Sequence, residues 1–329
     1  MTRVYIILFI LVSNISFIST SVGDRSPTYQ NNVLICMRSI CKKDGFSFNE
    51  TATKDLDIWT RLLWNCRDEC RYRCMWRSVR VFDDREFTVP KFHGKWPFRR
   101  MFGVQEPGSA VASLLNLMAY MRMSAQLSRQ FPVRTVPYVI FWHIFTLVCM
   151  NAWVWSIIFH TRDTPFTEFM DYASALSMVM AYFIAAFVRI FLRFRKLVGL
   201  MIAACLLYYG MHVQYLYGGF VDYDYNMRVN LAFGIAGGLL WGVWGSLRWL
   251  TGGVYRHGWR VAVFAAATAA GSCLELMDFP PLLNVWDAHA LWHLQTAPLP
   301  LLFYRYVIDD IHFLRRWKYT EKTVLMSST

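Results

Sequence analysis

Residues 137–159 read PYVIFWHIFTLVCMNAWVWSIIF, an apolar run without aspartate, glutamate, lysine or arginine. A helix of about 20 apolar residues is long enough to cross the hydrocarbon core of a bilayer. Similar runs recur along the chain, and 56% of its 329 residues are hydrophobic. A soluble domain of this length is more polar. The composition therefore predicts an all-α, multi-pass membrane protein.

Seven transmembrane helices are expected from the spacing of these runs. They are placed at residues 104–121, 137–159, 168–189, 197–219, 228–250, 260–279 and 288–308. The first has the weakest hydropathy and contains Ser109, Ser113 and Asn116, which indicates that it faces the bundle interior. The expected domains are a signal peptide at 1–23, a small lumenal domain at 24–103, a seven-helix catalytic domain at 104–308 and a cytosolic tail at 309–329.

Two signals predict the orientation of these helices. A basic start, a short apolar core and small residues up to Gly23 are typical of a cleavable signal peptide, which places the mature N-terminus at Asp24 in the lumen. The loops after the first, third and fifth expected spans are rich in arginine, as cytosolic loops are. The net charge of +12 is explained by these loops, so nucleic acid is not an expected partner.

Cysteines are concentrated before the first expected span. Five of the eight lie there: Cys36, Cys41, Cys66, Cys70 and Cys74. In an oxidising lumen disulfides are the default, although the spacing of the last three also allows a zinc cluster on one helix face. An odd number leaves one thiol unpaired or bonded to another molecule. Cys149, Cys205 and Cys273 lie in apolar runs and are expected to be packing residues. Asn49-Glu50-Thr51 is a glycosylation sequon, which fits a lumenal location.

Three separate stretches carry the candidate site: Ser156-x-x-x-His160, Asp171 and His289-x-x-x-His293. The second expected span ends in the lumen at His160. The third begins in the lumen with Asp171 in its first turn, and the seventh begins there with His289 and His293. The topology therefore brings these residues to one depth of the membrane.

The residue types at that depth predict a catalytic zinc site. Residues four apart share one helix face, so His289 and His293 can approach one metal ion together with His160. Three neutral imidazoles and an open fourth position are the zinc arrangement that supports catalysis, because the bound water loses a proton near neutral pH. Asp171 is a candidate base or a group that orients an imidazole, and Ser156 a hydrogen-bond donor to a developing oxyanion.

Further polar residues lie near the expected site. His143 lies about 25 Å from His160 along the second span and is expected to be an ordinary bundle residue. His212 is closer to the lumenal side and is a spare candidate ligand. Four others are candidates either for supporting the histidines or for packing helices together: Glu106, Asn116, Glu275 and Asp278.

The order of these motifs resembles a superfamily of intramembrane metallohydrolases that includes the alkaline ceramidases and the adiponectin receptors. Longer stretches are similar to the post-GPI-attachment to proteins factor 3 family. They are Gly23–Arg25, Cys66–Cys70, Phe92–Phe98, Gln105–Pro107, Asn151–Trp153, Phe159–Asp163, Leu276–Pro281 and Asp287–His293. At Asn32, four residues before Cys36, this family tends to carry a cysteine, which leaves one disulfide open.

The resemblance implies a function as well as a fold. His160, His289 and His293 are expected to bind zinc, and Ser156 and Asp171 to be catalytic. The implied reaction is hydrolysis of the sn-2 acyl ester of the lipid on GPI-anchored proteins, with release of an unsaturated fatty acid, in the Golgi membrane or the endoplasmic reticulum. GPI-anchored proteins and membrane lipid are then the expected partners.

Two other functions stay open at this stage. One is a ceramide amidase of the same superfamily, which would use the same site chemistry. The other is a non-enzymatic receptor or trafficking factor with a structural zinc ion, which a closed four-ligand site would favour. The sequence leaves undetermined the acyl-chain preference, the disulfide pairing, the oligomeric state and the choice between Golgi and endoplasmic reticulum.

Overall fold

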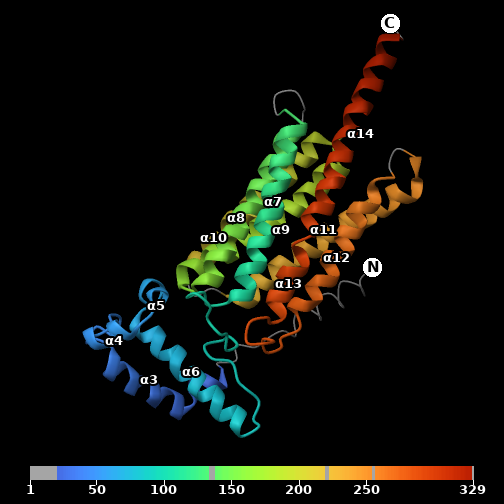
Figure 1. Ribbon diagram of the computed structural model, residues 1–329. Coiled ribbons are helices and arrows are strands. Elements are labelled where there is room, and N and C mark those ends of the chain that lie inside the picture. Colours follow the sequence, from blue (N-terminus) through green and yellow to red (C-terminus); the bar gives the residue numbers. More distant parts are fainter. Residues whose placement is uncertain (1–20, 133–137, 219–221, 254–255, 328–329) are drawn as a thin grey trace. The chain divides into compact units, whose positions relative to one another are not determined.

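The computed structural model describes residues 21–132, 138–218, 222–253 and 256–327, with side chains described as far as Arg316. The expected signal peptide at 1–23 lies almost wholly outside these ranges. Every regular element within them is a helix, and the β-bridges are isolated pairs (Figure 1). The all-helical prediction is confirmed for the described residues.

The contacts within the chain define two compact units. Among the described residues, the first unit, here called the cysteine unit, contains those up to Gly108 together with His160–Arg162 and Asp278–Ala288. The second, here called the helical bundle, contains the other described residues, which lie within 109–159, 163–277 and 289–327. The domain boundaries drawn from the sequence stay predictions.

The cysteine unit is built from short helices that begin at polar capping residues. They are α2 (Val22–Arg25), α3 (Pro27–Ile40), α4 (Glu50–Asp55), α5 (Ile58–Leu63) and α6 (Cys66–Asp84). The side chains of Asn49, Asp57 and Asn65 accept hydrogen bonds from the first-turn N–H groups of α4, α5 and α6. Such caps satisfy donors that the helix itself cannot, which explains where these helices start.

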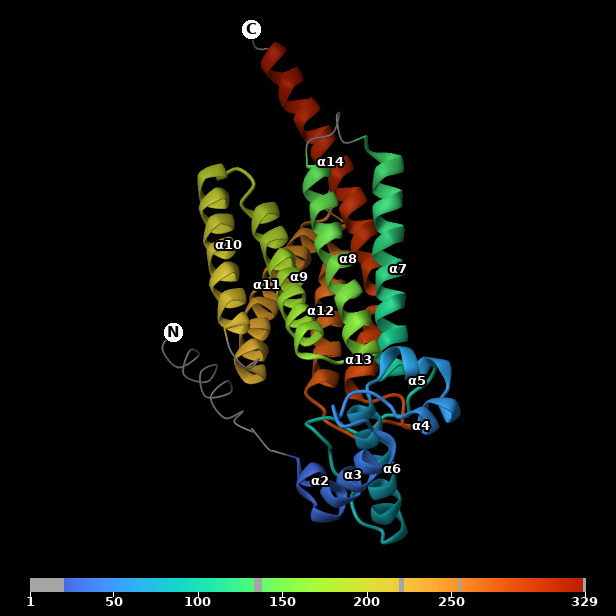
Figure 2. The same cartoon turned by 90° about the vertical axis from the view of Figure 1, so that its left-hand side faces the viewer.

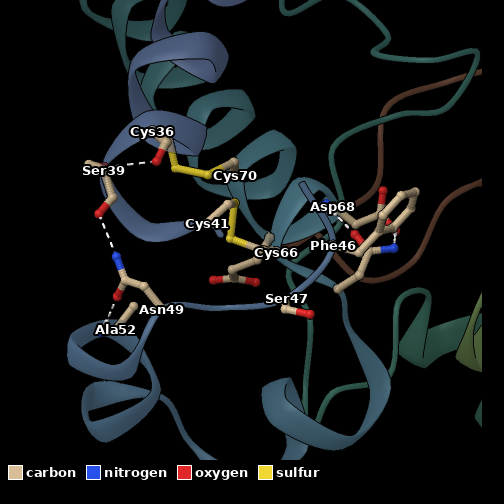
Figure 3. Close-up of a disulfide and its surroundings, with 12 residues drawn as sticks. Cys36, Ser39, Cys41, Phe46, Ser47, Asn49, Ala52, Cys66, Asp68 and Cys70 are labelled. Carbon is tan, nitrogen blue, oxygen red and sulfur yellow. Dashed lines mark hydrogen bonds between the residues drawn. A yellow bond between two sulfur atoms is a disulfide. The ribbon is translucent and has the colours of Figure 1, made fainter. Parts of the chain in front are cut away.

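Two disulfides join α3 and the residue after it to α6 (Figure 3). Cys36 pairs with Cys70, and Cys41 pairs with Cys66. The disulfide prediction is confirmed. Because Cys66 and Cys70 are both in disulfides, the alternative of a zinc cluster formed by Cys66, Cys70 and Cys74 is wrong. Cys74 is the remaining thiol; burial raises its pKa, so the thiol stays protonated and unreactive near neutral pH.

The sequon asparagine lies beside these disulfides (Figure 3). The amide oxygen of Asn49 accepts a hydrogen bond from the Ala52 N–H at 2.8 Å. Its amide nitrogen donates to the Ser39 carbonyl, also at 2.8 Å. Asn49 therefore has a structural role in fixing α4 against the end of α3.

The helical bundle contains the long helices of the chain. They are α7 (Pro107–Gln130), α8 (Val139–Thr161), α9 (Pro165–Ile190), α10 (Arg195–Tyr217), α11 (Tyr223–Thr251), α12 (Gly258–Glu275), α13 (Ala288–Thr296) and α14 (Leu299–Ser327). Helix α10 packs on α9, α9 on α11, α11 on α12, and α12 on α14 (Figures 1 and 2). A core of mainly aromatic and aliphatic side chains, with Trp241, Phe303 and Tyr306 among its largest fully buried members, joins α7, α8, α9, α11, α12 and α14.

Four helices of the described chain, α8 to α11, are long and apolar enough to cross a membrane. Helix α10 buries only Cys205, His212 and Leu216, and its many other apolar side chains face outward, as they do toward lipid. The chain is thus a helical protein with several membrane-spanning candidates, and the count of seven spans stays a prediction. Cys149 and Cys205 are buried as expected, but Cys273 is exposed, so its expected packing role is wrong.

The expected helix at 288–308 is broken into α13 and α14. The break lies at Ala297 and Pro298, where the Ala297 N–H turns back to the Leu294 carbonyl. Proline has no N–H to donate and disfavours helical geometry in the residue before it, so a continuous helix cannot pass this point. As a consequence, both histidines of the last motif lie on a separate helix of nine residues.

Candidate metal centre

Three histidines converge at the ends of two helices. His160 is the next-to-last residue of α8, and His289 and His293 lie one turn apart on α13. One ligand nitrogen from each lies within 4.8 Å of the other two. Only 1% of His160 and 5% of His293 is exposed. The grouping expected from the motifs is therefore present in the fold.

The spacing of these nitrogens suits a tetrahedral ion. The Nε2 atoms of His289 and His293 lie 2.8 Å apart, and all three ligand nitrogens fall within the 4.8 Å limit. Zinc–nitrogen bonds of about 2.0–2.1 Å place two ligands of a tetrahedral site about 3.3 Å apart. That separation is compatible with three nitrogens that all lie within 4.8 Å of one another. Imidazole nitrogens are also common zinc ligands, so the donor set fits zinc.

Two buried or half-buried glutamates fix the imidazoles from behind. Glu106 Oε2 lies 2.7 Å from His160 Nδ1, and Glu275 Oε2 lies 2.6 Å from His289 Nδ1. A carboxylate in this position keeps the proton on Nδ1 and presents the Nε2 lone pair to a metal. The sequence left the roles of Glu106 and Glu275 open, and their geometry favours support of the histidines.

A lysine compensates the buried charge of Glu106. Lys95 Nζ donates to Glu106 Oε1 at 2.6 Å, while the second carboxylate oxygen serves His160. A buried carboxylate is stable only when such partners replace its lost hydration. Lys95 could not be singled out in the sequence, because no spacing rule links it to Glu106, 11 residues later.

Helix α13 is held in place by hydrogen bonds with both neighbouring helices, α7 and α12. From α7, Asn116 Nδ2 donates to the His293 carbonyl at 2.7 Å. From α13 itself, Gln295 Nε2 donates to the Ala267 carbonyl of α12 at 3.1 Å. Gly271 leaves space for this contact, since a Cβ there would lie 2.1 Å from Gln295 Oε1. The orientation of the two histidines thus depends on contacts with α7 and α12.

The two expected catalytic residues lie on α8 and α9. Ser156 is buried one turn before His160, and its hydroxyl is 2.9 Å from that of Ser113 on α7. Asp171 is half-buried on α9, which begins at Pro165 behind a Thr164–Thr167 capping box. Because α9 starts earlier than expected, Asp171 lies in its second turn. The catalytic roles of both residues stay predictions.

Comparison with known proteins places the chain in a family. Residues 58–311, a range that includes all three histidines, match the model of the Per1-like family. The chain belongs to the Per1-like family. The resemblance to the post-GPI-attachment to proteins factor 3 family, drawn from its motifs, is confirmed.

Several animal relatives match this Per1-like chain over most of its length. It is 38% identical to a Drosophila melanogaster protein named "Post-GPI attachment to proteins factor 3", covering 92% of each chain. It is 39% identical to the Danio rerio and 37% identical to the Homo sapiens proteins named "GPI-specific phospholipase A2-like PGAP3". These matches cover 91% and 93% of this chain, and 94% of each relative. No solved structure matches the chain.

His212 and Asp278, two other candidates from the sequence, contact residues other than the three histidines. His212 is buried, and its Nε2 lies 3.1 Å from Asn226 Oδ1, so this nitrogen is engaged by an amide. His212 is not among the three converging histidines, and its proposed use as a spare ligand is unsupported. Asp278 accepts hydrogen bonds from Lys91 and from the Trp96 indole, within the cysteine unit.

Proposed function

We propose that this Per1-like chain hydrolyses the sn-2 acyl ester of the lipid on GPI-anchored proteins, with zinc held by His160, His289 and His293. The observation that carries the proposal is the convergence of three imidazoles, two of them oriented by glutamates. The names of the fish and human relatives, which contain the words GPI-specific phospholipase A2-like, support the choice of substrate.

Each residue has a distinct part in the proposed reaction. A zinc ion at the three histidines would supply the Lewis acidity that activates water and polarises the ester carbonyl. Glu106 and Glu275 hold the imidazoles of His160 and His289 with their Nε2 atoms toward that position. Asp171 accepts the proton that the attacking water loses. Ser156 donates a hydrogen bond to the ester oxygen as its negative charge develops.

The same proposal includes a topology. We infer seven spans, formed by the four apolar helices α8 to α11 together with α7, α12 and the α13–α14 pair. The N-terminal domain at 24–103 is lumenal after removal of a signal peptide, and the tail from residue 309 is cytosolic. The membrane is that of the Golgi or the endoplasmic reticulum. A GPI lipid in the lumenal leaflet can then reach histidines at the lumenal ends of α8 and α13.

Lipid mass spectrometry of a GPI-anchored reporter tests this function. The host is a cell line without its own remodelling hydrolase, supplied with wild type, His293→Ala or Asp171→Asn. His143→Ala, which removes a histidine of α8 far from the trio, is the matched control. We expect the lyso or remodelled anchor with wild type and the control only. If well-expressed wild type leaves the sn-2 chain intact, the substrate is wrong; turnover of ceramide would then favour an amidase.

A further inference from the structure

A groove between α11 and α12 lies outside the metal centre and has no part in the proposed reaction. Its volume is about 770 Å³. Its walls include Trp249, Arg256, Trp259, Arg260, Val263 and Ala266. Arg260 and Glu275 stand at opposite ends of α12, about 22 Å apart at 1.5 Å per residue. The groove therefore opens at the end of α12 remote from the histidines.

Next to the groove, α11 and α12 touch backbone to backbone at two glycines, Gly245 and Gly258. A Cβ on Gly258 would lie 2.6 Å from the Gly245 carbonyl oxygen, and one on Gly245 would lie 2.8 Å from the Gly258 carbonyl oxygen. Small residues allow such close approach of membrane helices. Along α12 the groove is lined by Ala262, Val263 and Ala266. These side chains are too small to fill the space between them and α11.

Two arginines, Arg256 and Arg260, line the groove at the N-terminal end of α12. Arg256 is exposed, and among the residues that the structure describes it has no acidic partner. Arg260, four residues further on, pairs with Asp309. Between them His257 contributes to the wall, with its Nε2 3.5 Å from Asp310 Oδ1 and its ring stacked on Tyr306. The mouth of the groove thus carries an uncompensated guanidinium.

Aromatic residues at the same level indicate the surface of a bilayer. Trp249 is 51% and Trp259 is 39% exposed, and both border the groove. Exposed tryptophans are typical of the membrane–water interface. Helix α11, which forms one wall, is one of the four helices apolar enough to span a membrane. A cationic mouth at headgroup level and an apolar wall below it match the two halves of a phospholipid.

We propose that this groove binds an anionic phospholipid of the bilayer as a second lipid site, distinct from the substrate site. Its phosphate contacts the guanidinium groups of Arg256 and Arg260. One acyl chain lies along Val263 and Ala266 on α12. By the positive-inside rule this end of the bundle faces the cytosol, so the bound lipid belongs to the leaflet opposite the proposed substrate.

The test uses the full chain in nanodiscs of phosphatidylcholine, titrated with phosphatidic acid and followed by native mass spectrometry. Arg256→Gln removes the uncompensated charge, and Arg122→Gln, at an exposed arginine of α7, is the matched control. We expect Arg256→Gln to weaken phosphatidic acid binding about fivefold, the usual effect of one arginine near a membrane surface, and Arg256→Lys to retain it. Equal binding by the Arg256→Gln and Arg122→Gln variants overturns the proposal.

A second variant distinguishes a lipid from a free phosphate. Ala266→Leu fills the apolar part of the groove and leaves both arginines in place. We expect it to weaken phosphatidic acid binding and glycerol 3-phosphate to compete poorly against the lipid. If glycerol 3-phosphate competes as well as the lipid and Ala266→Leu changes nothing, the groove is a phosphate site and the lipid proposal is wrong. Thermal unfolding of each variant checks that the bundle is intact.

Discussion

Replacing Glu106 by glutamine removes the anionic acceptor behind His160 while keeping the size of the side chain. The glutamate uses its two oxygens for two donors, His160 Nδ1 at 2.7 Å and Lys95 Nζ at 2.6 Å. Glutamine has one acceptor oxygen and one NH₂ group. One of the two donors must then face the NH₂ group, in a site where Glu106 and His160 are both buried.

The expected result is a loss of metal affinity. Changing such a carboxylate behind a ligating histidine typically lowers the affinity about 10- to 100-fold. This corresponds to about 1.4–2.7 kcal/mol of binding free energy. The measurement is a competition titration of zinc on the purified full chain with a chromophoric chelator, together with the metal content by mass spectrometry. Glu50→Gln, at an exposed glutamate of α4, is the control for loss of one negative charge.

The double variant Lys95→Met with Glu106→Gln tests whether Lys95 and His160 compete for the single amide oxygen of the glutamine. Without the lysine, the single amide oxygen can turn to His160 Nδ1, so we expect part of the lost zinc affinity to return. A Glu106→Gln variant that folds normally and binds zinc within twofold of wild type would refute the supporting role of this glutamate. A double variant weaker than Glu106→Gln alone would refute the competition between the two donors.

Three further predictions concern other parts of the chain. Cys36→Ser should lower the unfolding free energy by about 3 kcal/mol, because the nested Cys41–Cys66 disulfide leaves a loop of only about ten residues for Cys36–Cys70 to close. Cys74→Ser should change it little, and chemical denaturation measures both. Gly271→Ala should displace Gln295 and weaken zinc binding by the same titration, with a normal zinc affinity arguing against this contact as an anchor of α13. Burial and the charge of nearby Arg71 lower the pKa of His93 below its usual 6.5. As the pH falls, this histidine is therefore protonated in the unfolded chain before it is protonated in the folded chain. The unfolding free energy should therefore fall as the pH drops through 6.5, and a His93→Gln variant should show a smaller fall.

Prolines in the sequence mark two helix boundaries that hydropathy did not predict, the break between α13 and α14 and the start of α9. The break between α13 and α14 falls in Thr296-Ala297-Pro298-Leu299-Pro300, where two prolines interrupt an apolar run. Hydropathy alone treats such a run as continuous, and only the missing N–H of proline reveals the break. The earlier start of α9 was marked by Thr164-Pro165, a capping residue followed by a proline at the first helical position.

The supporting residues of the metal centre could not be predicted with the same certainty. Glu106 precedes His160 by 54 positions in the chain, and Glu275 precedes His289 by 14. No spacing rule links such pairs, because the contact depends on how separate helices pack. The same holds for the disulfides, since five cysteines allow many pairings and only the fold of α3 against α6 selects Cys36 with Cys70.

The sequence by itself determined the helical membrane class, the disulfide-bearing N-terminal segment and the candidate histidines. Hydropathy, cysteine content and i, i+4 spacing are local properties that a single chain displays directly. The tertiary structure decided which cysteines pair and which glutamate orients which imidazole. It also decided that α11 and α12 border a groove next to Gly245 and Gly258. These features depend on distances between segments remote in sequence, and packing of the folded helices alone sets those distances.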